Sequence, residues 1–109
     1  YVGPMLGQHH QFHRYNSGKD KWGEERYFKI TKTIYGDLDE RLGQSKYLAG
    51  DNYSIADIAT FPWIARHDWH DIGLKNYNNL TRWYLEIARR QAVIKGYDFM
   101  KRGETIPQP

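Results

Sequence analysis

The chain of 109 residues is long enough for one domain with a single core, and its 16% aromatic residues make much of that core aromatic. It contains no cysteine, which excludes a disulfide framework, a thiolate nucleophile and a Cys-ligated metal. A net charge of +3 predicts a weak attraction for anions but not nucleic-acid binding.

The first part of the chain predicts two helices separated by a polar loop. Apolar and histidine side chains recur at three- and four-residue steps over 2–15, the period of one helix face. Residues 16–20 have the composition of a loop. A long helix is expected over 21–42, and we interpret Gly36 inside it as a point of close approach between helices. The apolar stripe of this helix is Tyr27, Ile30, Ile34, Leu38 and Leu42.

The start of the central helix carries the strongest local signal. Ser54 suits the N-cap position, and Asp57 can reach back to the Ser54 amide and complement the positive end of the helix dipole. Tyr53 and Ile58 are spaced as a hydrophobic staple. We therefore predict a buried helix opened by a structural capping box, in which Asp57 is a cap and not a catalytic acid. Pro62 predicts a kink near its middle.

The last third predicts two more helices and an irregular tail. Residues 67–71 form a polar exit from the central helix, and an amphipathic run follows Asn78 or Asn79. A final helix is expected from about Gln91, with Ala92, Val93 and Gly96 as a small-residue contact. Residues 103–109 should fray. With no strand-like alternation and no repeat, the sequence predicts one all-α domain over 1–109 with about five helices.

The histidine pairs suggest a metal site at first sight. His9 and His13 are spaced i, i+4, and His67 and His70 are spaced i, i+3, so each pair shares a helix face. Zinc needs three or four ligands, and neither pair has a carboxylate in the position of a His-Glu-x-x-His helix. We expect solvated or hydrogen-bonded histidines and no metal. No nucleophile–base constellation and no glycine-rich phosphate loop is visible in the chain.

Three segments carry a resemblance to a known family. Residues 47–59, YLAGDNYSIADIA, resemble the L-x-G-x-x-x-[ST]-x-A-D segment of the C-terminal domain of cytosolic glutathione transferases. The opening 3–12, GPMLGQHHQF, and the segment Glu25-Arg26-Tyr27 resemble the bacterial Nu class and its relative, the prion-forming fungal nitrogen regulator. The resemblance implies a glutathione-transferase C-terminal-type helical bundle whose first helix is truncated at Tyr1. It also implies that the chain is a fragment lacking an N-terminal thioredoxin-like domain.

The resemblance also implies site residues. Arg26 would hold a carboxylate of glutathione, since a guanidinium pairs bidentately with carboxylates. The alternative is a surface ion pair with Glu25 or another acid on a helix surface. Gln8, Met5 and Phe12 lie about one turn apart and would line a substrate pocket, or else simply pack against a neighbouring helix. No catalytic residue is expected in the fragment, which would be inactive alone.

The resemblance implies a parent enzyme that uses glutathione as a co-substrate and no covalently bound cofactor. Its reaction would be thiol conjugation to a small electrophile, or reduction of a disulfide or peroxide, and the family resembled is homodimeric. The main alternative is a non-catalytic dimerisation or scaffolding module of the same fold. A third reading, an unrelated helical nucleic-acid module, rests only on mild basicity. No segment approaches the ~20 apolar residues of a membrane span and no signal peptide is recognisable, so we expect a cytoplasmic protein without a membrane partner.

Overall fold

The computed structural model describes residues 1–109 and contains helices but no strands. The all-α prediction is confirmed. The structure has six α-helices and one π-helix, against about five predicted helices, because the π-helix and the short α4 are separate elements. The elements are α1 (Val2–His9), η1 (His10–Tyr15, the π-helix), α2 (Lys21–Gln44), α3 (Ile55–Ile64), α4 (His67–His70), α5 (Asn78–Ala88) and α6 (Gln91–Tyr97).

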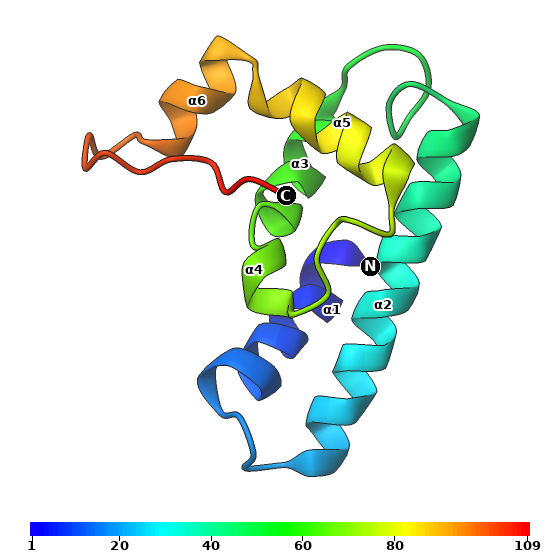
Figure 1. Cartoon of the computed structure of the whole chain (residues 1–109), viewed down its shortest axis with the longest axis vertical. Helices are drawn as coiled ribbons and strands as arrows, with labels where there is room; N and C mark the ends of the chain where they lie inside the picture. The colour runs from blue at the N-terminus through cyan, green and yellow to red at the C-terminus, as the bar shows by residue number, and fades with distance from the viewer.

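The long helix α2 runs along one side of the bundle, and both α1 and α5 pack against it (Figure 1). α3 lies in the middle and contacts α1 and α5. α6 packs against α5, has no buried residue and projects from the top of the bundle. The largest fully buried side chains come from α1, α2, α3, α5 and the segment before α5. These include Leu6, Ile34, Tyr35, Ile64, Leu74, Leu80, Trp83, Tyr84 and Ile87.

The first predicted helix is present, but its winding changes halfway. α1 ends at His9 and continues directly into the π-helix η1. Extended π-helical turns are rare and often accompany functional sites. After the loop 16–20, the Asp20 carboxylate caps α2 by accepting a hydrogen bond from the Gly23 amide at 3.0 Å. α2 thus begins where the sequence predicted and runs two residues further, to Gln44.

The predicted capping box at the start of α3 is confirmed. The Ser54 amide donates to Asp57 Oδ2 at 3.0 Å, and the Ala56 amide donates to Ser54 Oγ at 3.3 Å. Pro62 lies inside α3, which continues to Ile64. The helix is buried on one face only, because Ile55 and Ile58 are 81% and 54% exposed.

The prediction that Gly36 marks a close approach is wrong. A Cβ built at Gly36 would meet no atom within 4 Å. The close approach lies at Gly23, where a Cβ would be 2.6 Å from Cε1 of Phe12. A second one lies at Gly3, where it would be 3.1 Å from Nε1 of Trp63. η1 therefore packs on the first turn of α2, and not on its middle, where Gly36 lies.

The C-terminal tail is irregular but attached. Residues 103–105 are exposed, whereas Ile106 is buried and the Tyr84 hydroxyl donates to the Pro107 carbonyl at 2.6 Å. Asp98 Oδ1 accepts hydrogen bonds from the Arg102 and Glu104 amides, which folds the chain back toward α5 (Figure 1). The expectation of a frayed tail is therefore not supported for Ile106 and Pro107.

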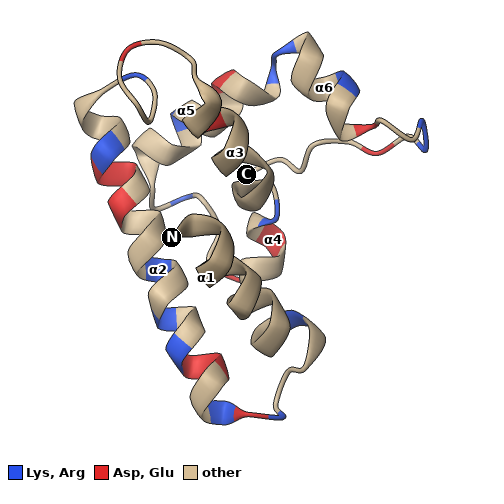
Figure 2. Ribbon diagram, turned by 180° about the vertical axis from the view of Figure 1, so that it is seen from behind, with Lys and Arg blue, Asp and Glu red and all other residues tan.

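Charged side chains are distributed unevenly over the helices. Figure 2 shows many on α2, whereas α1 carries none and α3 carries only Asp57. This agrees with the central place of α1 and α3 in the bundle. None of the helices combines the length and apolarity that crossing a membrane requires.

Candidate functional site

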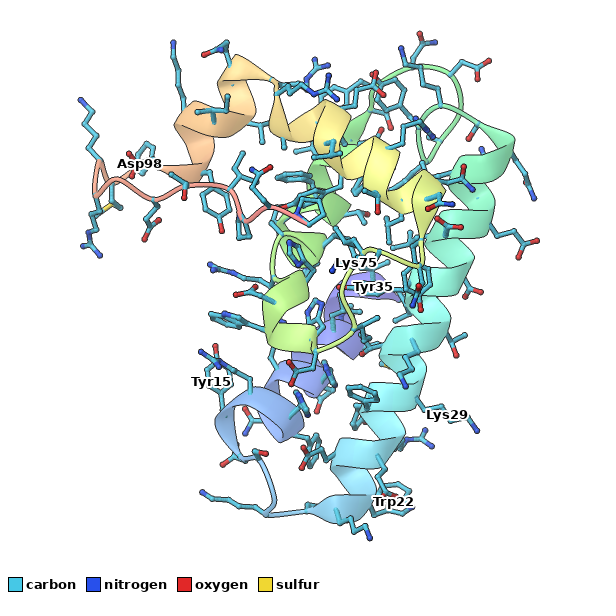
Figure 3. The ribbon with its side chains drawn as sticks, in the orientation of Figure 1. Tyr15, Trp22, Lys29, Tyr35, Lys75 and Asp98 are labelled. Atoms are coloured by element: carbon cyan, nitrogen blue, oxygen red, sulfur yellow. The ribbon has the colours of Figure 1, made fainter.

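Arg26 lies on the exposed side of α2, close to the loop that precedes this helix. Its guanidinium carbon is 5.5 Å from the ring centroid of Trp22 and 5.9 Å from that of Tyr27, so the cation is held over aromatic rings. Trp22 itself is 71% exposed, and it points away from the bundle (Figure 3). Glu25 pairs with Lys21 at 3.8 Å, so Arg26 does not form the ion pair with Glu25 that was the alternative reading.

The three residues expected to line a substrate pocket do not meet in one cavity. Met5 is half-buried and lines a hollow of about 530 Å³ between α1 and α2. Gln8 is exposed. Phe12 stacks on Tyr27, with ring centroids 5.4 Å apart. Phe12 also lines a separate hollow of about 200 Å³, so Met5 and Phe12 lie beside two different hollows.

A hollow of about 450 Å³ lies along α2, and Arg26 is not among the residues that line it. Its lining combines cations, carboxylates and one aromatic ring: His13, Lys21, Glu24, Glu25, Phe28, Lys29 and Lys32. Lys29 lies on the outer side of α2 in Figure 3, and Lys32 Nζ is 4.5 Å from the ring centroid of Phe28. A surface of this composition suits a zwitterionic ligand with carboxylate and ammonium groups better than an apolar one.

Glu24 ties this hollow to the loop before α2. The Gly18 amide donates to one of its oxygens at 3.0 Å, and His13 Nδ1 lies 3.0 Å from the other. These two contacts, the backbone bond first, hold the pKa of the Glu24 carboxyl below its usual value. His13 Nε2 lies 2.7 Å from Asp71 Oδ2, so this ring bridges the start of α2 and the end of α4.

The other histidines are more deeply buried than solvated residues would be. His10 Nε2 lies 2.7 Å from His70 Nε2, and His70 Nδ1 lies 2.7 Å from the Tyr35 hydroxyl. His9 Nε2 lies 3.1 Å from the His70 carbonyl oxygen. The hydrogen-bonded interpretation therefore holds for His9, His10 and His70. The chain has no group of three or more His, Asp or Glu residues positioned to hold a metal ion.

Burial dominates the electrostatics of this cluster. Desolvation lowers the pKa of His70 to about 3, and it also lowers the pKa values of His9 and His10. Burial raises the pKa of the Tyr35 hydroxyl above its usual value. Sequence reasoning missed this cluster because 60 residues separate His10 from His70. His70 directly follows Trp69, but His10 stands between His9 and Gln11, so the local sequence carries no signal common to both.

A second surface missed by the sequence is a groove of about 570 Å³ between α3, α5 and α6. Seven of its twelve lining residues are apolar, among them Ile58, Phe61 and Val93. The Arg90 guanidinium lies 3.8 Å from the ring centroid of Tyr53 at its edge. The predicted small-residue contact of α6 is wrong for Gly96, because a Cβ there would meet nothing within 4 Å and the residue lines this open groove. Val93, by contrast, packs against the core.

Comparison with known proteins identifies the family. Residues 7–91 match the family model described as "Glutathione S-transferase, C-terminal domain". The chain belongs to this family. The chain is 40% identical over 91 residues to the disulfide-bond oxidoreductase YfcG of Escherichia coli K12, which covers 84% of the chain and 42% of the relative. It is 28% identical over 125 residues to protein URE2 of Kluyveromyces lactis, covering 84% of the chain and 32% of the relative.

Solved structures agree with this family. The crystal structure of a glutathione transferase from Burkholderia graminis, with two glutathione molecules bound per subunit, superimposes with a TM-score of 0.82 at 37% identity. The match covers 94% of this chain and 45% of that chain. A family member from Pseudomonas fluorescens, also with two glutathione molecules bound, gives 0.73 at 36% identity over 87% and 45%. The chain thus spans less than half the length of these relatives.

Proposed function

We propose that this domain is the helical part of a glutathione-dependent enzyme that reduces disulfides or peroxides, or conjugates glutathione to small electrophiles. The observation that carries the proposal is the 40% identity to a disulfide-bond oxidoreductase, together with glutathione in two structural neighbours. In such an enzyme the reacting sulfur is activated as a thiolate, with charge-stabilising donors around it. This chain has no cysteine and places no nucleophile–base pair beside its hollows, so its own part is to bind and orient glutathione.

Within this proposal Arg26 binds a carboxylate of glutathione. Its guanidinium is exposed, stands over Trp22 and is not paired with Glu25, so both edges of its planar fork are available. A bidentate pair with a carboxylate is stronger than a neutral hydrogen bond and fixes the orientation of the ligand. Trp22 and Tyr27 support this geometry, because they restrict the guanidinium before a ligand arrives.

The test is the Michaelis constant for glutathione in the complete protein. Arg26→Ala should raise it by roughly ten- to a hundredfold, which corresponds to about 1.5–3 kcal/mol for a hydrogen bond to a charged group. Arg26→Lys should recover part of the loss, since an ammonium lacks the planar fork. The turnover number should fall less, because a carboxylate remote from the sulfur is bound similarly in the ground and transition states.

A matched control removes the same charge elsewhere. Arg89 is exposed directly after α5 and donates only to the Leu85 carbonyl of that helix, so Arg89→Ala should leave the Michaelis constant for glutathione unchanged. If the two substitutions raised the Michaelis constant equally, Arg26 would act only through the net positive charge of the protein and not by binding the carboxylate. An unchanged constant in Arg26→Ala would refute the assignment.

The same proposal extends to the class of the protein, its location, its oligomeric state and its second domain. We place the domain nearest the bacterial Nu class, in a cytoplasmic homodimer whose other half is a thioredoxin-like domain. The rival reading is a non-catalytic dimerisation or scaffolding module. Retention of the complete protein on immobilised glutathione, with elution by free glutathione, supports the enzyme; passage through the column supports the module.

A further inference from the structure

Four buried side chains join α4 to three earlier parts of the bundle. His70, at the end of α4, contacts Tyr35 of α2 through Nδ1 and His10 of η1 through Nε2. Its carbonyl oxygen lies 3.1 Å from Nε2 of His9, the last residue of α1. Tyr35, His9 and His70 have no exposed surface, and His10 is 8% exposed. Figure 3 shows Tyr35 on the inner side of α2. We call His9, His10, His70 and Tyr35 the histidine latch.

In the His10–His70 contact, only one of the two facing ring nitrogens can carry a hydrogen. Two ring nitrogens 2.7 Å apart form a hydrogen bond only if one carries hydrogen and the other offers a lone pair. An imidazolium is a donor at both nitrogens. If both rings were charged, two N–H groups and two positive charges would face each other at this distance. The contact would then be repulsive.

His9 tolerates no additional proton either. The His70 carbonyl can only accept, so His9 must donate through Nε2 and its proton-free nitrogen is Nδ1. His9 Nδ1 is buried and has no hydrogen-bond partner. Protonation there would create a buried N–H without an acceptor, and such a group is destabilising.

The groups around the latch offer little compensation for positive charge. The carboxylates of Glu24 and Asp71 are occupied by His13, which lies between them. Arg66 adds positive charge near His10, and His67 adds a further titratable ring near His70. The ionisable groups that face the latch are His13 of η1, Glu24 of α2, Arg66, His67 and Asp68 around the start of α4, Asp71 after it, Tyr77 before α5 and Tyr84 of α5.

From this arrangement we propose that the histidine latch is an acid-sensitive fastening, which holds α4 against α1, η1 and α2 and releases it when the histidines take up protons. The lowered pKa values of His9, His10 and His70 agree with this direction. A histidine whose pKa is lower in the folded than in the unfolded chain takes up its proton on unfolding. The stability that the latch provides is therefore complete above about pH 6.5 and is lost as the pH falls from there toward about 3.

The experiment is urea unfolding of the full chain, followed by far-UV circular dichroism, between about pH 7.5 and 5.5, where ordinary carboxylates stay ionised. Each histidine that stays neutral only in the folded state raises the unfolding constant about tenfold over this range. The wild type should show a rise of about a hundredfold or more. His70→Gln should reduce the rise by about tenfold, because an amide can accept from Tyr35 and donate to His10 but does not titrate.

The control variant is His13→Gln, which removes a histidine that already has Glu24 and Asp71 as partners for its charge. It should keep the full rise. A wild-type unfolding constant that is the same at both ends of the range, or a full rise in His70→Gln, would overturn the proposal.

If His70→Gln fails to fold, NMR of the wild type decides the question instead. The chain has five histidines, so five ring C2–H resonances can be followed. Those of His9, His10 and His70 should not titrate before the protein unfolds. Titration of His10 or His70 near pH 6.5 while α4 is still packed against α2 would refute the latch.

Discussion

Asp57 is the most connected polar side chain of the domain, and its removal gives the sharpest test of how the fold is held. It has no exposed surface. Its Oδ1 accepts from the Leu48 amide at 3.1 Å and from Trp83 Nε1 at 2.8 Å. Its Oδ2 accepts from the Ser54 amide at 3.0 Å and from Ser54 Oγ at 3.3 Å. One carboxylate therefore joins the connector after α2, the start of α3 and the middle of α5.

Asp57→Ala leaves three N–H donors without an acceptor: two backbone amides and the Trp83 indole. An unsatisfied buried donor is destabilising by about 1–3 kcal/mol, and hydrogen bonds to charged acceptors lie at the upper end. The three losses overlap, because water can enter beside the partly buried Leu48 and Ser54 amides. We therefore expect a decrease of about 3–5 kcal/mol in the free energy of unfolding, a large share of the 5–15 kcal/mol typical of a domain.

The assay is urea unfolding at neutral pH with Ser54→Ala as the internal comparison. Ser54→Ala removes the two 3.3 Å bonds of the hydroxyl, one from the Ala56 amide and one to Asp57 Oδ2, and should lower stability by about 1 kcal/mol. Asp57→Asn keeps the shape but offers one oxygen in place of two, so its effect should lie between the two alanine variants. If Asp57→Ala were no more destabilising than Ser54→Ala, the carboxylate would be only a helix cap, and its bonds to Leu48 and Trp83 would contribute nothing.

Two further predictions concern packing and assembly. Gly36→Ala should raise the free energy of unfolding by about 0.5–1 kcal/mol, because the position is helical and the added methyl meets no atom within 4 Å. Gly23→Ala should lower the free energy of unfolding by about 1–3 kcal/mol, because its methyl clashes with the Phe12 ring. Urea midpoints of the two variants check this pair, and a loss of stability in Gly36→Ala would contradict it. The complete protein should sediment as a homodimer joined by an isologous contact, and a monomer at micromolar concentration would contradict that expectation.

Local signals were enough to predict five helices and the cap of α3, but not the change to π-helical winding at η1 or the separate helix α4. Ser54 and Asp57 are three residues apart, so the chemistry of the cap is contained in a short segment and is visible in the sequence. The same is true of the start of α2 after its polar loop. Only the consequences of folding were hidden: nothing in the local sequence shows that the Trp83 indole, 26 residues further on, donates to the same carboxylate.

The glycines show why packing resists prediction from one sequence. Gly36 stands in the middle of the apolar stripe of α2 and was expected to make room for a neighbour, whereas Gly23 stands in its polar first turn. The place where α2 meets the Phe12 ring depends on the path of the chain through the π-helix η1 and the loop 16–20, which together set where α2 begins relative to η1. A single-residue change of winding in η1 would move that contact, and no periodicity in the sequence encodes it.

Asp57 and His70 each join segments that lie far apart in the sequence, but their contacts differ in kind. Asp57 accepts from donors of three segments, so each of these contacts pairs a fixed donor with a carboxylate oxygen. His70 lies between another imidazole and a hydroxyl, so its contacts depend on where each proton sits. The latch therefore fixes α4 only while its imidazoles stay neutral, and mild acid should loosen α4 as the histidines take up protons.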